Sequence, residues 1–243
     1  MEKIEDTDGC FHITGSEAKH IFRVLRMGKG DRIILMDGRG KRFEAEIVSA
    51  GRDSVRVILE RPLPVPLPSP VEITLCQSLL KPRSMDYLIE KTSELGVDRV
   101  IPFFSQRTVV RLAGDRSAGR VAHWRAVARS AAKQADRIRP AEISPPLPFK
   151  DLIGEWKKAE IPKMMLWESE GITGLGEMLR AHTAARHLVG MVGPEGGFSR
   201  NEVIMARDAG FTSVSMGQRI LRAETAAITF VAVVQYERGD LGL

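Results

Sequence analysis

Cysteine and long apolar runs are both scarce in this 243-residue sequence. The two cysteines, Cys10 and Cys76, lie far apart and form no CxxC pair, so we expect neither a disulfide framework nor a zinc site. The longest apolar run, Ala226 to Val234, is much shorter than the roughly 20 residues that span a bilayer. The acidic start, MEKIEDTDG, lacks the apolar stretch of a signal peptide. These absences favour a soluble, cytoplasmic protein without a metal site or a membrane span.

Two common phosphate-binding motifs are absent as well, because the sequence has neither a P-loop nor a GxGxxG that opens a helix. Two other glycine-containing turns follow apolar runs, reading GPEGGFSRNE after residues 187–192 and GQRILRAETA after residues 211–216. Glycine tolerates positive φ and lets a ligand approach the backbone closely. We therefore expect a ligand held by backbone groups and shape, as an uncharged adenosine would be.

Prolines at every second position between residues 61 and 71 mark the boundary between two domains, 1–68 and 69–243. Such a run favours an extended spacer over a helix or a central strand. Before it, residues 32–36, 42–48 and 55–59 are β-like, and the turn at 37–40 predicts a hairpin. A single basic helix is expected over residues 16–27.

After the spacer, strand and helix patterns alternate. Strands are expected at 71–79, 99–104, 163–167, 187–192 and 211–216, and helices at 84–95, 118–137 and 226–236. Ser199 and Glu202 form a capping box, which predicts another helix start. The alternation indicates an α/β domain whose parallel sheet is covered on both faces. Both glycine turns follow strands, at the edge where open α/β sheets bind ligands.

The basic residues are clustered, although the net charge is only +5. Residues 19–42 contain eight Lys or Arg against two acids, and residues 107–139 contain nine against two. In the second cluster basic side chains recur every four residues, at Arg125, Arg129, Lys133 and Arg137. Like charges at this spacing cost a helix a few tenths of a kcal/mol per pair, whereas a bound polyanion would make them favourable. The alternative is a solvated helix face.

The pairing of GPEGGFS with GQRILRAETA closely resembles the signature of the RsmE family. That family comprises knotted methyltransferases of the SPOUT superfamily, which methylate N3 of one uridine in small-subunit ribosomal RNA. The resemblance extends over AKHIFRVLRMGKGDRI, KPRSMDYLIEKTSELGVDRVIPFFSQRT and HWRAVARSAAKQADRIRP, in the family's order. One departure is clear, because Lys133 stands before Gln134 where the family usually has an acid. Any role of that acid does not carry over.

The resemblance implies a C-terminal SPOUT domain with a deep trefoil knot and an N-terminal PUA-like β-barrel that binds RNA. It also implies S-adenosylmethionine as cofactor, 16S rRNA in the small ribosomal subunit as substrate, and a homodimer that completes the active site. The expected cofactor-binding residues lie in and beside the glycine turns, at Leu166, Trp167, Gly193, Glu195, Gly196, Gly197, Met216, Gly217, Ile220 and Leu221. The expected RNA-binding residues are Lys19, Arg23, Arg26, Arg125, Arg129, Lys133 and Arg137.

Arg222 and Glu224 are the candidates for catalysis, since both follow the second turn. As N3 of the uracil loses its proton, charge spreads onto the carbonyl oxygens, which a fixed guanidinium can stabilise. Glu224 either accepts the proton, holds Arg222, or serves only as a first-turn acid of the following helix. Glu195 is open to a similar alternative, in which it supports its own turn through backbone amides. We assign no histidine to catalysis.

Two rival functions remain open. A methyltransferase of the same superfamily acting on another rRNA position would keep both turns. The other is a noncatalytic RNA-binding protein that acts in ribosome assembly. The presence of Lys133 in place of the family's acid suggests this function, whereas the intact GPEGG and LRAET elements disfavour it.

Overall fold

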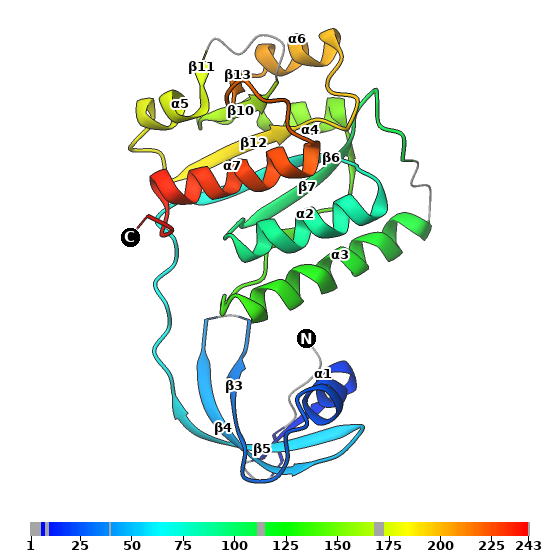
Figure 1. The fold of residues 1–243 in the computed structure, drawn as a ribbon, viewed down its shortest axis with the longest axis vertical. Coiled ribbons are helices and arrows are strands. Elements are labelled where there is room, and N and C mark those ends of the chain that lie inside the picture. Colours follow the sequence, from blue (N-terminus) through cyan, green and yellow to red (C-terminus); the bar gives the residue numbers. More distant parts are fainter. Residues whose placement is uncertain (1–5, 8–9, 39, 111–114, 168–172, 243) are drawn as a thin grey trace. The chain divides into compact units, whose positions relative to one another are not determined.

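A computed structural model describes residues 6–7, 10–38, 40–110, 115–167 and 173–242 (Figure 1). The chain forms two compact units, Met1–Leu67 and Pro68–Leu243. This division lies one residue before the one that the proline run predicts. Each unit has its own sheet and its own buried apolar side chains.

The first unit is a five-stranded antiparallel sheet in the order β1-β2-β5-β4-β3. Its strands are β1 (Asp6–Thr7), β2 (Cys10–Thr14), β3 (Arg32–Met36), β4 (Arg42–Ala50) and β5 (Ser54–Pro62). The predicted hairpin is present, since β3 pairs with β4, and Asp37 Oδ1 accepts from the amides of Gly40 and Lys41 at 2.9 Å. Arg39 of the predicted turn lies outside the described residues.

The predicted helix over residues 16–27 was wrong in form and length. Helix α1 (Gly15–Lys19) continues as a π-helical segment, η1 (His20–Val24), which ends well before Met27. Arg26 adopts a left-handed φ of +54°, and the amide of Met27 donates to Ile21 O at 3.1 Å. This closure reverses the backbone, so a regular helix cannot continue through Met27. Ala18 and Ile21 are buried in the core of the unit.

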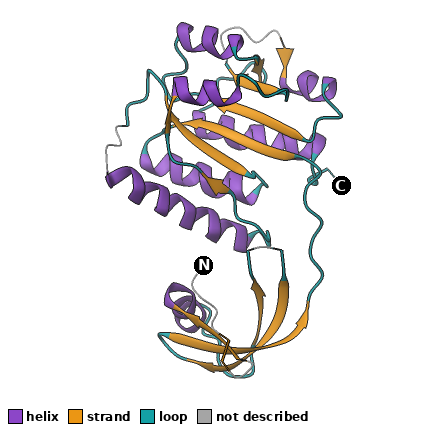
Figure 2. Cartoon of the chain, turned by 180° about the vertical axis from the view of Figure 1, so that it is seen from behind, coloured by secondary structure: helices purple, strands orange, loops and turns teal. Residues whose placement is uncertain are grey.

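The second unit is built on an eight-stranded sheet whose strands all pair in parallel (Figures 1 and 2). The order is β11-β13-β10-β12-β6-β7-β8, with β9 also paired to β7. The five predicted strands are confirmed, as β6 (Glu72–Ser78), β7 (Arg99–Phe104), β10 (Lys163–Leu166), β12 (His187–Val192) and β13 (Phe211–Ser215). The sequence pattern missed three strands of two residues each, β8 (Glu142–Ile143), β9 (Leu147–Pro148) and β11 (Thr173–Gly174).

Helices cover both faces of this sheet, which confirms the predicted fold class. The helices are α2 (Pro82–Glu94), α3 (Asp115–Gln134), α4 (Phe149–Trp156), α5 (Leu175–Ala181), α6 (Arg200–Asp208) and α7 (Ala223–Arg238). One apolar cluster contains side chains of α2, α3, α5 and α7, and the other contains side chains of α4 and α6. The apolar side chains of β12 alternate between the two clusters, which is why its sequence is a continuous apolar run.

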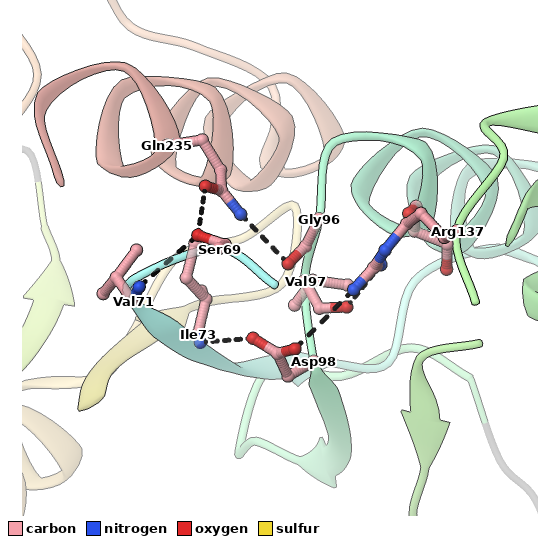
Figure 3. Close-up of polar contacts among 9 residues, drawn as sticks. Ser69, Val71, Ile73, Gly96, Val97, Asp98, Arg137 and Gln235 are labelled. Atoms are coloured by element: carbon pink, nitrogen blue, oxygen red, sulfur yellow. Dashed lines mark hydrogen bonds and ion pairs between the residues drawn. The ribbon is translucent and has the colours of Figure 1, made fainter. Parts of the chain in front are cut away.

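At the end of the sheet opposite the glycine turns, a polar network joins four segments of the second unit (Figure 3). The Arg137 guanidinium donates to Ser93 O at 2.7 Å and to Val97 O at 2.8 Å, and lies 3.6 Å from Asp98 Oδ1. Asp98 Oδ2 accepts from the amide of Ile73 at 2.8 Å. Burial raises the pKa of Asp98, and the Ile73 amide and the Arg137 guanidinium oppose that shift.

Gln235 of α7 completes the network. Its Nε2 donates to Gly96 O at 3.1 Å, and its Oε1 accepts from Ser69 Oγ at 2.9 Å. Gln235 is buried, so both hydrogen bonds satisfy polar atoms of its own side chain that lie away from water. The network therefore ties the C-terminal helix to the end of α2 and to the segment that leads into β6.

Candidate cofactor site and active site

A cavity of about 320 Å³ lies at the carboxyl ends of the neighbouring strands β13, β10 and β12. Both glycine turns contribute to its walls, as the sequence pattern predicts. Of the predicted cofactor-binding residues, those that line it are Leu166, Trp167, Gly193, Glu195, Gly197, Met216, Gly217, Ile220 and Leu221. Gly196 does not line it. The second unit thus brings together segments that are about fifty residues apart in the chain.

The first turn leads from β12 into α6 through the predicted capping box. Ser199 N and Ser199 Oγ each donate to Glu202 Oε2 at 2.9 Å, and Glu202 N donates back to Ser199 Oγ at 3.4 Å. The predicted helix start at Ser199 is therefore confirmed. Both residues are buried, so the cap fixes the direction in which the chain leaves the cavity.

A loop that was not expected to be part of the site supports the first turn from outside the cavity. After β7, the amide of Gln106 donates to Glu202 Oε1 at 2.8 Å, and Arg107 Nη1 donates to Gly196 O at 2.8 Å. Gly196, which does not line the cavity, therefore contacts Arg107. The loop follows a strand of the parallel sheet, as both glycine turns do. The sequence pattern could therefore have predicted that it lies at the same edge of the sheet.

Glu195 is fixed by a different segment from the one expected. Its Oε1 accepts from the backbone amide of Lys81 at 3.4 Å, at the N-terminus of α2. This contact is with α2, whereas the alternative expected contacts with the amides of its own turn. A carboxylate at this position also interacts favourably with the positive end of the helix dipole.

The second turn leads from β13 into α7. Gly217 has a φ of +97°, a conformation that favours glycine, and Arg222 is the N-cap residue of α7. Arg222 is exposed, lines the cavity, and makes no side-chain capping bond. Small side chains of α7, Ala223 and Ala226, complete the wall.

The structure separates the two residues that we expected to act in catalysis. Glu224 lies in the first turn of α7 but does not line the cavity. Within the described part of the chain it makes no ion pair with Arg222. Its position in this chain matches the alternative of a first-turn acid, which stabilises a helix N-terminus.

The expected RNA-binding residues fall into different environments. Lys19, Arg23 and Arg26 are exposed on the first unit, and Arg125, Arg129 and Lys133 are exposed on α3. Arg125 also donates from Nε to Ile143 O at 3.0 Å. Arg137 lies beyond the end of α3, because Asp136 has a left-handed φ of +54°. Its guanidinium is held in the polar network described above, so we remove Arg137 from the RNA-binding set.

We expect Arg137→Ala to lower the free energy of unfolding by about 2 kcal/mol, because it removes charged hydrogen bonds and leaves Asp98 without its guanidinium partner. Urea denaturation would measure the loss. The matched control is Arg129→Ala on the exposed face of α3, which should leave unfolding unchanged while weakening RNA binding and its salt dependence. A reversed pattern between the two variants would return Arg137 to the RNA-binding face.

The described ranges of the chain contain no group of three or more His, Cys, Asp or Glu side chains arranged to hold a metal ion. Nor does any helix there have the length and apolar character needed to cross a membrane.

Comparison with known proteins identifies the family. The family model described as the RNA methyltransferase domain matches residues 67–235, and the RNA methyltransferase PUA domain matches residues 13–60. The ribosomal RNA small subunit methyltransferase E of Bacillus subtilis is 27% identical, over 98% of this chain and 96% of its own. The protein of that name from Aquifex aeolicus is 31% identical, over 90% of each chain.

A solved structure agrees with this result over the whole fold. The ribosomal RNA small subunit methyltransferase E of Neisseria gonorrhoeae, bound to S-adenosylmethionine, is 30% identical with a TM-score of 0.89, covering 98% of this chain and 97% of that one. Fold, site and comparisons thus define an RNA methyltransferase of the α/β class with a PUA domain. More narrowly, the chain belongs to the RsmE family of ribosomal RNA small subunit methyltransferases, which confirms the resemblance in its sequence motifs.

Proposed function

We propose that this protein transfers a methyl group from S-adenosylmethionine to N3 of one uridine in the 16S rRNA of the small ribosomal subunit. The observation that carries the proposal is the cavity between the two glycine turns, with Arg222 at its edge. The Neisseria gonorrhoeae relative, which has the same overall fold, is bound to this cofactor. We further propose that the protein acts in the cytoplasm, where ribosomal subunits are assembled.

The residues of the cavity fit such a cofactor. Its walls combine backbone groups of two turns with apolar side chains, which suit an uncharged adenosine, and its two basic side chains, Arg219 and Arg222, are exposed. The acid among the lining residues, Glu195, already accepts a hydrogen bond from Lys81. Ile220 is 80% exposed beside the cavity, so a bound ligand would remove apolar surface from water there.

When bound, S-adenosylmethionine supplies a methyl group already activated by its sulfonium. The turns then have to hold donor and acceptor in line, which lowers the barrier by removing orientational freedom. In the proposed mechanism Arg222 donates to the uracil carbonyl oxygens, where negative charge develops as N3 loses its proton. We assign Glu224 a supporting role at the start of α7, since it does not line the cavity.

We also propose that the protein acts as a homodimer. Between Glu224 and Glu237 the sequence of α7 has no charged residue. Its partly or fully exposed side chains include an apolar stripe at helical spacing, namely Ile228, Ala232, Val233 and Tyr236. A surface helix facing water usually carries charge on that side, so the absence of charge supports packing against a second copy. Light scattering after gel filtration would give the mass that tests this.

The experiment that tests the function is an incubation of the purified protein with S-adenosylmethionine and unmodified small ribosomal subunits, followed by nucleoside mass spectrometry. We expect 3-methyluridine. A different methylated nucleoside would favour the superfamily member with another rRNA target. No product, combined with no binding of S-adenosylmethionine in calorimetry, would favour the noncatalytic RNA-binding alternative. Naked 16S rRNA in parallel reactions would show whether the assembled subunit is required.

A further inference from the structure

An exposed surface on the first unit combines apolar and basic side chains in a way that phosphate binding alone does not require. We call it the 19–26 surface, and its members are Lys19, Phe22, Arg23, Val24, Leu25 and Arg26. The exposed fractions are 41% for Phe22, 66% for Val24 and 52% for Leu25. Three large apolar side chains therefore face solvent within four consecutive positions.

The backbone of this segment is held in two uncommon conformations. The π-helical segment η1 spans His20–Val24, and such wide turns occur frequently at functional sites. Arg26 then occupies a left-handed position at the end of the helix, where glycine is the usual residue. Glycine would be less strained there. An arginine with an exposed side chain at this position therefore supports a functional role for that side chain.

The charge of the segment points to a polyanion. Residues 18–30 contain four basic residues and no acid, the basic ones being Lys19, Arg23, Arg26 and Lys29. Basic side chains alone would bind any RNA through its phosphates. Exposed aromatic and aliphatic side chains add a contact that only unpaired bases can make, because bases in a duplex are stacked on one another.

We propose that the 19–26 surface binds an unpaired stretch of RNA, with a base stacked on Phe22 and neighbouring bases against Val24 and Leu25. Lys19, Arg23 and Arg26 contact the phosphates on either side. This proposal rests on the proposed function, since an rRNA substrate provides the strand. It adds that the first unit recognises single-stranded rather than duplex RNA.

The test uses the full-length protein and two RNA probes of one sequence, a short single strand and its duplex. Phe22→Ala should weaken single-strand binding about tenfold, which equals about 1.4 kcal/mol, and leave duplex binding unchanged. Phe22→Tyr should restore the affinity, whereas Phe22→Leu should not, because leucine has no aromatic face. Ile34→Ala is the matched control, since Ile34 is an exposed apolar residue of β3 in the same unit.

A second readout reports stacking of a base directly. A single strand with 2-aminopurine at an internal position should lose fluorescence on binding to the wild-type protein, and this quenching should disappear with Phe22→Ala. Equal losses of single-strand and duplex affinity, or no loss at all, would overturn the proposal. So would binding to phosphatidylglycerol vesicles that exceeds RNA binding and depends on Phe22, because the surface would then be a membrane contact.

The two proposals fail in different ways. If subunits yield no methylated nucleoside but single-strand binding still depends on Phe22, the proposed reaction is wrong and the 19–26 surface stands. If 3-methyluridine forms and Phe22 has no effect on binding, the surface proposal is wrong and the reaction stands.

Discussion

Replacing Arg222 with alanine should slow single-turnover methylation by about 10²- to 10³-fold, the range for removal of one fixed donor to a developing oxyanion. Arg222 is exposed at the edge of the cavity and makes no capping bond, so its guanidinium is available to the substrate. Affinity for S-adenosylmethionine should change little, because the charge that Arg222 stabilises in the proposed mechanism appears only as N3 loses its proton. Rapid-quench kinetics with saturating cofactor would measure the rate, and calorimetry the affinity.

Two further variants sharpen this test. Arg222→Lys keeps the charge but loses the planar fork of donors, so it should recover only part of the rate. Arg219→Ala is the matched control, because Arg219 is also exposed and lines the same cavity. If Arg222→Ala retains full single-turnover activity, Arg222 has no part in the mechanism. If Arg219→Ala is equally slow, general positive charge rather than the position of Arg222 accounts for the effect.

Gly217→Ala should weaken binding of S-adenosylmethionine by at least about tenfold, or about 1.4 kcal/mol. Gly217 has a φ of +97°, and no atom lies within 4 Å of the position that a Cβ would take. The new methyl group therefore has space, and its cost arises from the backbone conformation alone. The turn should relax to negative φ and displace Met216, Ile220 and Leu221, which line the cavity. Calorimetric titration with S-adenosylmethionine would show the loss.

Gly154→Ala provides the control for Gly217→Ala. Gly154 lies in α4, has the same open surroundings, and is not among the glycines with positive φ. Alanine there should raise the free energy of unfolding by about 1 kcal/mol, because it is the better helix former, and should leave cofactor affinity unchanged. Unaltered cofactor affinity in Gly217→Ala would show that the shape of the second turn does not determine binding.

The sequence pattern predicted the sheet and the turns well for a physical reason. Strands buried on both faces, such as β12, need apolar side chains at every position, so they appear as short continuous runs. Glycine turns and the Ser199–Glu202 capping box can also be predicted from the sequence, because the residues that interact are only a few positions apart. The trefoil knot stays a prediction from the family resemblance, because a pattern of strands and helices does not contain it.

The structure departs from the expectations drawn from the sequence where distant residues decide the outcome. Arg137 fits a helical spacing of four with Arg129 and Lys133, but carbonyl groups near the end of α2 hold its side chain. Gly196 belongs to the GPEGG turn, yet it does not line the cavity, and its carbonyl accepts from Arg107, which follows another strand. The helix over residues 16–27 has suitable ends in sequence, but the left-handed Arg26 closes it early.

By itself, the sequence determined the family, the alternation of strands and helices, and the two turns that form the cavity. These features depend on local periodicity, on glycine at fixed positions, and on motifs whose residues are contiguous in the sequence. Only the tertiary structure decided which polar side chains reach the cavity and which hold the scaffold. Arg222 and Glu224 are two residues apart, but a helix start turns successive side chains in different directions, so only Arg222 lines the cavity. Buried polar groups form hydrogen bonds with the groups that lie close to them in space, and the packing of the whole sheet determines which groups are close.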